Sequence, residues 1–335
     1  MAALALTDSF QRRIRYLRIS VTDRCNLRCT YCMPEEGLDW KPRHELLSYE
    51  EWIRIVRAMV PLGIEKIRVT GGEPLVRSGI VGFLGMLTAI DGLKDVTLTT
   101  NGILLAGLAD GIREAGVRRI NVSLDTFRPE TFIRISKRDD HHRVMEGIRA
   151  AREAGFNPLK INCVVLPGVN DDEVLDFVEW TTREPVIVRF IENMPLSGQY
   201  DGVETLGDTI PSSELVRRIR LEYPFDLVTD EAGSKGNNGL YAVKGAPGRV
   251  EFISAVSHSF CEHCDRLRLT AEGQLRWCLF DNAECDLRAI VRDPGKADED
   301  IVNVFRRIIR EKPEAHLIGQ YATAPSSRFM SAIGG

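Results

Sequence analysis

The regular alternation of strand-like and helix-like segments is the feature that most limits what this chain can fold into. Six short segments rich in β-branched residues recur between residues 16 and 191, with helical periods between them. Such alternation produces a parallel sheet with helices packed outside it. Since a complete barrel needs eight units, we predict an α/β fold with a partial (β/α)6 TIM-like barrel, and a doubly wound sheet is the alternative. The predicted strands are residues 16–21, 66–70, 96–100, 119–124, 159–165 and 186–191.

Local signals mark where the helices begin and end. Ser48 and Glu51 have the spacing of a capping box at the start of the helical segment SYEEWIRIVRAMV. Gly63, Gly116 and Gly155 each follow a helical period and precede a predicted strand, as expected for glycines that end helices. These signals support the predicted order of strands and helices.

The predicted strands have one apolar and one polar face. In the first strand, Leu17 and Ile19 alternate with Arg18 and Ser20, and successive strand residues point to opposite faces. Because helices must cover the apolar face, we expect the polar face to line a hydrophilic chamber, whereas complete barrels fill this space with apolar side chains. The alternative is a sheet face exposed to solvent. Cys163 falls on the apolar face, where we expect a small core residue.

Unusual loops follow the first four predicted strands. A cysteine-rich loop follows the first, TGGEP (70–74) the second, TTNG (99–102) the third and SLD (123–125) the fourth. In barrels, the loops at this end of the strands build active sites. Gly71 and Gly72 allow a backbone to approach a ligand closely, although an ordinary turn explains the GGEP motif equally well.

Length and composition limit the remaining possibilities. A chain of 335 residues exceeds most single cores, so we predict a barrel domain over 1–220 and a smaller C-terminal domain over 221–335. The net charge of −4 and the lack of a long apolar run argue against nucleic acid or a membrane as partner. With no signal peptide recognised, we expect a cytoplasmic protein whose clustered cysteines are ligands instead of disulfides.

Two groups of three cysteines stand out. Cys25, Cys29 and Cys32 have the spacing C-x3-C-x2-C, whereas a structural zinc site needs four ligands. Three thiolates can hold a 4Fe-4S cluster that keeps one iron open, and a zinc loop with a distant fourth ligand is the alternative. The second group has the spacing C-x2-C-x13-C, which taken alone favours zinc. This group is Cys261, Cys264 and Cys278, with Cys285, His258 and His263 as candidate fourth ligands.

The first cysteine group resembles the radical S-adenosylmethionine (SAM) superfamily. The spacing, Tyr31 before the last cysteine, the position after the first strand and the downstream GGEP all agree. The resemblance implies that Cys25, Cys29 and Cys32 hold a 4Fe-4S cluster whose open iron is chelated by SAM. It also implies that the reduced cluster cleaves SAM to methionine and a 5′-deoxyadenosyl radical.

Nearly the whole chain is similar to the GTP 3′,8-cyclase (molybdenum cofactor biosynthesis protein A) family. The segments RISVTDRCNLRCTYCMP, RVTGGEPLVR, CDRLRLTAEGQLRWCL and the terminal Gly-Gly carry this resemblance. It implies two 4Fe-4S clusters, the second on Cys261, Cys264 and Cys278 with its open iron on the guanine of GTP. On this view Cys285 and the two histidines are not ligands.

The resemblance also assigns individual residues. The matches to SAM contacts are Tyr31, Gly72, Ser123 and Met194. The matches to GTP contacts are Arg18, Arg68, Thr99, Lys160, Arg266 and Arg268, and Arg189 joins them as a strand cation. A triphosphate carries about four negative charges, and arginine side chains are suited to bind its oxygens. Arg18, Gly334 and Gly335 are assigned to catalysis; the two glycines lack a Cβ and can enter a narrow chamber, whereas a frayed end is the alternative.

The reaction implied by the family begins with removal of the ribose 3′ hydrogen of GTP. The C3′ radical then attacks C8, and reduction gives 3′,8-cyclo-7,8-dihydro-GTP, which a separate cyclic pyranopterin monophosphate synthase consumes. An external electron donor is needed, and a homodimer is one option for assembly. The alternative functions are a peptide-modifying maturase with an auxiliary cluster and a zinc-ribbon protein that binds nucleic acid.

Overall fold

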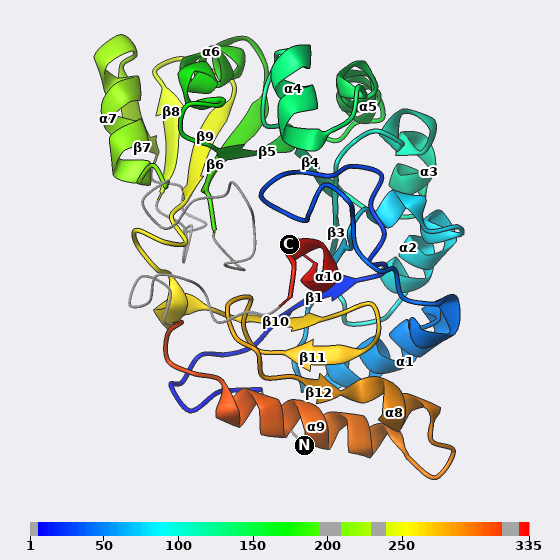
Figure 1. Ribbon diagram of the computed structural model, residues 1–335. Helices are drawn as coiled ribbons and strands as arrows, with labels where there is room; N and C mark the ends of the chain where they lie inside the picture. Colours follow the sequence, from blue (N-terminus) through cyan, green and yellow to red (C-terminus); the bar gives the residue numbers. More distant parts are fainter. Residues whose placement is uncertain (1–5, 195–208, 229–238, 317–327, 335) are drawn as a thin grey trace.

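The computed structural model describes residues 6–194, 209–228, 239–316 and 328–334 (Figure 1). One twelve-stranded sheet runs through these residues in the order β12-β11-β10-β1-β2-β3-β4-β5-β6-β9-β8-β7. Figure 1 shows this sheet curling around the C-terminal helix, with the longer helices on its outer side.

The six predicted strands are all present and each pairs in parallel with its neighbour. Parallel neighbours with helices outside are the arrangement of a partial barrel, so the predicted fold class is confirmed. The strands are β1 (Tyr16–Ser20), β2 (Lys66–Thr70), β3 (Asp95–Thr100), β4 (Arg119–Ser123), β5 (Leu159–Val165) and β6 (Val186–Glu192).

The later strands extend both ends of this sheet. β10 (Arg266–Leu269) pairs in parallel with β1, and β9 (Arg249–Ile253) pairs in parallel with β6. The antiparallel strands are β7 (Phe225–Val228), β8 (Leu240–Val243), β11 (Gln274–Arg276) and β12 (Cys285–Asp286). The second cysteine group therefore lies at the same sheet as the first, which the sequence pattern did not indicate.

The helices between the strands follow the predicted signals. α1 (Tyr49–Met59) begins with the Ser48–Glu51 capping box, and Gly63, Gly116 and Gly155 have φ values of 105°, 91° and 83°, as helix-ending glycines do. The other helices are α2 (Ile80–Thr88), α3 (Ala109–Glu114), α4 (Pro129–Ser136), α5 (His141–Glu153), α6 (Val174–Arg183), α7 (Ser212–Glu222), α8 (Leu287–Arg292), α9 (Asp298–Glu311) and α10 (Met330–Ile333). The domain boundary predicted at residue 220 lies within α7 and stays a prediction.

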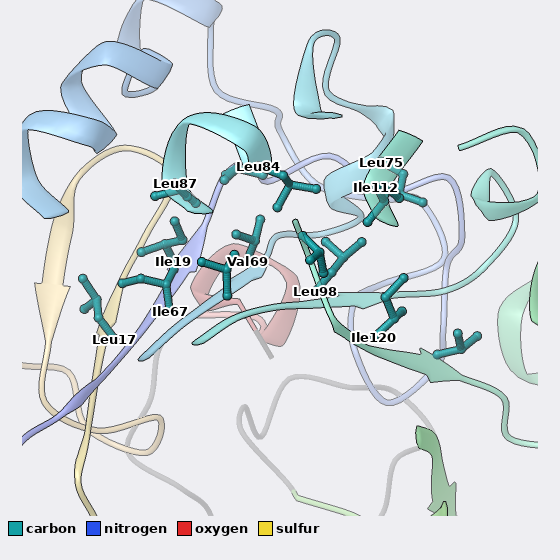
Figure 2. Packing of buried hydrophobic residues seen from close by; sticks show 14 of the residues in the cluster. Leu17, Ile19, Ile67, Val69, Leu75, Leu84, Leu87, Leu98, Ile112 and Ile120 are labelled. Atoms are coloured by element: carbon teal, nitrogen blue, oxygen red, sulfur yellow. The ribbon is translucent and has the colours of Figure 1, made fainter. Parts of the chain in front are cut away.

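The core lies between the outer face of the sheet and the helices. Ile19, Ile67 and Leu98 are completely buried and pack together with Leu84 and Leu87 of α2 (Figure 2). The apolar face of the strands is thus covered, as predicted, and the polar face is turned to the other side. Cys163 is 2% exposed and belongs to this core, which confirms its predicted structural role. None of the helices in the described ranges is long and apolar enough to cross a membrane.

Candidate active site

Three arginines stand side by side on the polar face of the sheet. The strand register pairs Arg18 of β1 with Arg268 of β10 on one side and with Arg68 of β2 on the other. Residues paired in register point to the same face, so this arginine row (Arg268, Arg18 and Arg68) crosses three strands. Burial, followed by repulsion from Arg268, lowers the pKa of Arg18 well below its ordinary value. The row therefore concentrates positive charge at a largely enclosed place, where Arg268 is 7% exposed and Arg18 and Arg68 are partly buried.

Tyr16 lies one row below and is enclosed by guanidinium groups. The guanidinium carbons of Arg68 and Arg266 are 5.6 and 6.0 Å from its ring centroid. Burial acts to raise the pKa of Tyr16, but the neighbouring arginines outweigh it and the pKa is lowered. Its hydroxyl is buried and has no hydrogen-bond partner among the described residues. Tyr16 was not among the predicted site residues, although its spacing of two from Arg18 places both side chains on one face of β1.

Lys160 and Arg189 share a single acidic partner. Glu251 of β9 accepts hydrogen bonds from Arg189 Nε and Nη2 at 2.9 and 2.6 Å and from Lys160 Nζ at 3.3 Å. Burial, followed by repulsion from Arg189, lowers the pKa of Lys160 to about 8. Two of the predicted GTP contacts are thus partly neutralised by a residue that sequence reasoning missed, because β9 was not predicted.

The first cysteine group lies in the loop between β1 and α1. Burial raises the pKa of Cys25 to about 11 and that of Cys32 to about 12, and it also raises the pKa of Cys29 well above the ordinary value of a thiol. The thiols are therefore neutral at pH 7 in the protein alone. Iron binds the thiolate, so loading of a cluster releases protons here.

Polar contacts connect this loop to the loops after β2 and β3. Asn101 Nδ2 donates to Asn26 Oδ1 at 2.8 Å, and Cys25 Sγ lies 3.9 Å from the same nitrogen. Glu73 accepts from Thr100 Oγ1 at 2.7 Å and from the Asn101 N–H at 2.6 Å. Glu73 is 1% exposed, and burial raises its pKa to about 7. The TGGEP and TTNG loops thus meet at the first cysteine group, as their positions after neighbouring strands predicted.

The four predicted SAM contacts occupy different places. Tyr31 donates its hydroxyl proton to Asp125 Oδ2 at 2.7 Å, and burial raises the pKa of Asp125 to about 6. Ser123 is the last residue of β4. Met194 instead packs against a small apolar group, Ala255, Leu279, Phe280 and Ile333, which Cys278 also contacts. Thr99, a predicted GTP contact, is partly buried on β3 and paired in register with Asn121.

Gly72 is needed for packing against the cysteine loop. Its N–H donates to the Thr22 carbonyl at 2.7 Å, and a Cβ at this position would lie 2.6 Å from the Asp23 carbonyl oxygen and closer still to that of Arg24. Real Cβ atoms do not approach backbone so closely. The close approach that the sequence suggested toward a ligand is thus made by the chain's own loop.

Replacing Gly72 with Ala is therefore expected to destabilise the protein by about 1–3 kcal/mol, the usual cost of overpacking, and to lower the iron content of the first site. Urea unfolding and iron analysis measure the two effects. Gly82→Ala is the matched control, because a Cβ there meets nothing within 4 Å. An unchanged urea midpoint for Gly72→Ala would contradict the packing argument.

The second cysteine group surrounds the amino end of β10. Cys261 begins a short 3₁₀ turn (Cys261–His263) just before this strand, Cys264 follows the turn directly, and Cys278 follows β11. Cys285 lies in β12, where its Sγ accepts a hydrogen bond from Arg307 Nη2 at 2.8 Å. In the described ranges, no three His, Cys, Asp or Glu side chains converge in a way that could hold one metal ion. The ligand roles of both cysteine groups stay predictions of the sequence.

The C-terminal helix reaches into the space enclosed by the sheet (Figure 1). The Gly334 carbonyl accepts a hydrogen bond from Arg268 Nη1 at 2.7 Å. Gly334 has φ +71°, and a Cβ would lie 3.0 Å from Ser20 Cβ. Ile333 is 1% exposed and anchors this segment. Gly334 thus lies at the arginine row, while Gly335 is outside the described residues.

Comparisons with known proteins agree with this geometry. Residues 19–181 match the radical SAM superfamily, and residues 186–318 match Molybdenum Cofactor Synthesis C. The GTP 3′,8-cyclase of Geobacter sulfurreducens is 46% identical over 334 residues, which are 99% of this chain and 100% of that protein. The chain belongs to the GTP 3′,8-cyclase family. The GTP 3′,8-cyclase of Streptomyces coelicolor is 43% identical over 340 residues, 99% of this chain and 97% of that protein.

Further relatives show the same relationship. Molybdenum cofactor biosynthesis protein 1 of Bos taurus is 43% identical over 312 residues, which cover 93% of this chain and 48% of that protein. Among solved structures, Streptococcus suis SuiB bound to S-adenosylmethionine has a TM-score of 0.60 at 15% identity, covering 84% of this chain and 66% of that one. This similarity concerns the fold alone. Family membership identifies a radical SAM enzyme and gives no support to the maturase and zinc-ribbon alternatives.

Proposed function

We propose that this protein converts GTP to (8S)-3′,8-cyclo-7,8-dihydroguanosine 5′-triphosphate, the first step of molybdenum cofactor biosynthesis. The observation that carries the proposal is the place of the arginine row. β10 and β1 are parallel neighbours in the sheet. Cys264 lies two residues before the amino end of β10, whereas Cys25 follows the opposite, carboxyl end of β1. Arg18 and Arg268 stand midway along these two strands. An anion held by the row would therefore lie between the two cysteine groups.

The charge of the row suits a triphosphate. Burial, followed by repulsion from Arg266, lowers the pKa of Arg268 to about 10, and burial also lowers the pKa of Arg68. Buried like charges repel each other until an anion joins them. A triphosphate with about four negative charges supplies that anion, and arginines bind its oxygens in pairs. Lys160 and Arg189 contribute less positive charge, since Glu251 binds both.

The cysteine groups fit the cofactors of the family by their donor chemistry. Three cysteines in each group leave one coordination position of a 4Fe-4S cluster for an external ligand. The first group would hold the 4Fe-4S cluster that binds SAM. Together, the bound cluster and SAM would supply the 5′-deoxyadenosyl radical. We infer that the second group holds a second 4Fe-4S cluster, whose open iron takes the guanine base. An external electron donor, a downstream cyclic pyranopterin monophosphate synthase, a homodimeric assembly and a cytoplasmic location stay predictions.

The protein's own contribution is placement. Arg18, Arg68 and Arg268 would fix the triphosphate, and the Gly334 carbonyl beside Arg268 would limit where the ribose can lie. Correct placement of reacting atoms in a site closed to water supplies much of the rate of such reactions. Removal of a hydrogen atom needs no general base, so no His–Asp pair is required at the strand ends.

Arg266→Ala tests the predicted triphosphate contact next to the arginine row. Arg266 lies on β10 two residues before Arg268, and among the described residues its side chain has no hydrogen bond to the C-terminal segment, whereas Arg268 has one. We expect GTP to bind roughly ten- to a hundredfold more weakly, which corresponds to the 1.5–3 kcal/mol of a hydrogen bond to a charged group. SAM cleavage without GTP should persist. Equilibrium binding of GTP and of guanosine by the anaerobic protein distinguishes phosphate from base contacts.

The matched control is Arg217→Ala, which removes an exposed arginine paired with Glu214 on α7. It should leave GTP binding unchanged. An equal loss of guanosine and GTP binding in Arg266→Ala would show that Arg266 does not act on the triphosphate. A wild-type protein that binds no GTP would refute the proposed function itself.

A further inference from the structure

Lys312 is a buried ammonium beside the second cysteine group. It is 4% exposed and immediately follows α9. Its Nζ donates to the carbonyls of Trp277 and Arg266 at 2.9 and 3.3 Å, and it lies 3.5 Å from Cys264 Sγ. Among the described residues, its hydrogen-bond partners include no carboxylate. Within the described part of the chain, this lysine therefore has no anionic hydrogen-bond partner, which a buried charge normally has.

A buried ammonium without an anion is costly. The effective penalty for removing one ion from water is several kcal/mol, and an opposite charge must offset it. Two carbonyl dipoles offset part of that penalty, and a neutral thiol adds little. A thiolate at Cys264, as iron ligation requires, would supply the missing negative charge. The position of Lys312 is thus explained once the second cysteine group carries an anionic metal centre.

Neighbouring contacts hold Lys312 in place. Arg12 Nη1 donates to the Glu314 carbonyl at 2.6 Å and to the Cys261 carbonyl at 2.7 Å, and Arg12 Nη2 donates to the Pro313 carbonyl at 2.6 Å. Arg12 is itself 7% exposed and paired with Asp8. The segment that follows α9 is therefore fastened to the cysteine loop, and the ammonium of Lys312 is kept from turning toward solvent.

The charged groups beside the two cysteine groups differ. At the first group, the buried Glu73 carboxylate accepts from Asn101, whose Nδ2 lies 3.9 Å from Cys25 Sγ, and Arg28 Nη1 donates to the Cys25 carbonyl at 2.8 Å. At the second group, the Lys312 ammonium lies 3.5 Å from the Cys264 sulfur itself. Positive charge and N–H donors beside a cluster stabilise its reduced, more negative state. Lys312 is thus placed where its charge would act on the second cluster.

We propose that Lys312 is a positioning residue of the second iron–sulfur site, which donates to the Cys264 thiolate and makes the second cluster easier to reduce. This inference rests on the proposed function, in which the second group holds a 4Fe-4S cluster. The lysine touches the ligand sulfur and has no contact with substrate in this role.

The test uses the full chain with Cys25, Cys29 and Cys32 replaced by Ala, so that any iron signal comes from the second site. Lys312→Gln keeps N–H donors without the charge, and Lys312→Arg keeps the charge. Iron and sulfide content and the midpoint potential, followed by electron paramagnetic resonance, are compared after anaerobic reconstitution. Lys296→Gln is the control, because Lys296 is an exposed lysine paired with Asp300.

For Lys312→Gln we expect at least a tenfold fall in the ratio of reduced to oxidised cluster at a fixed potential. This fall corresponds to a midpoint potential lower by about 59 mV for a one-electron couple. Loss of iron in Lys312→Gln, with iron retained in Lys312→Arg, would support the proposal equally. Lys296→Gln should match the reference. Unchanged iron and potential in Lys312→Gln, or equal iron loss in the Gln and Arg variants, would overturn the role of the charge. A reference protein without a second cluster would instead refute the proposed function.

Discussion

Deletion of Gly334 and Gly335 is expected to reduce formation of the cyclised product on the order of a hundredfold while leaving both cysteine sites loaded. The Gly334 carbonyl accepts from Arg268 Nη1, so the deletion removes the tail from one end of the arginine row. A misplacement of about 1 Å in a reacting pair costs roughly this factor. Cyclised product, 5′-deoxyadenosine and iron content are measured together in the anaerobic enzyme.

A second variant distinguishes the effect of removing the two glycines from the effect of moving the terminal carboxylate. Truncation moves the terminal carboxylate to Ile333, where the new negative charge could interact with the arginine row. The full-length variant Gly334→Ala keeps the terminus in place, but it strains the left-handed backbone at φ +71° and brings a Cβ within 3.0 Å of Ser20. We expect it to lose product as well. Wild-type product yield from the truncated enzyme would show that the tail has no part in the reaction.

Replacement of Cys278 with Ala should halve the iron content and abolish cyclisation. Two 4Fe-4S clusters give about eight irons per chain, and loss of the second leaves about four. In the proposed function this cluster anchors the guanine base, so its loss should prevent cyclisation, whereas the cleavage of SAM at the first site should persist. Iron and sulfide analysis of anaerobically reconstituted protein, with product formation, measures both effects.

Cys285→Ser is the matched control for this experiment. Cys285 is the fourth cysteine of the region, but it lies in β12 and its Sγ accepts from Arg307. We therefore expect this variant to keep about eight irons by the same cluster count. One zinc in place of four irons at the second site, or iron loss in Cys285→Ser, would contradict the cluster assignment.

The parts of this protein that depend on short stretches of chain were predictable from the sequence. The period-two alternation of Leu17, Arg18 and Ile19 indicated which face of β1 meets the helices, because successive strand residues point to opposite faces. Capping by Ser48 and the glycine after α1 are similarly local. The cysteine spacings are local as well, so both triplets could be recognised before any fold was known.

Tertiary structure decided which distant residues meet. β10 pairs with β1 across about 250 residues of chain, and only this pairing brings Arg268 beside Arg18. The pairing of β9 with β6 likewise gives Arg189 its partner Glu251. Such strand pairings depend on packing of the whole sheet, and the register of each strand follows from burial of its apolar face.

The same reason explains the remaining differences. Gly72 contacts the cysteine loop, and Lys312 contacts Cys264, through approaches that no local pattern encodes. By itself, the sequence determined the strand–helix order, the polar face and the two cysteine groups. The order of strands in the sheet, the arginine row and the place of Gly334 were decided by long-range packing, because residues far apart in sequence become neighbours only when the sheet closes around them.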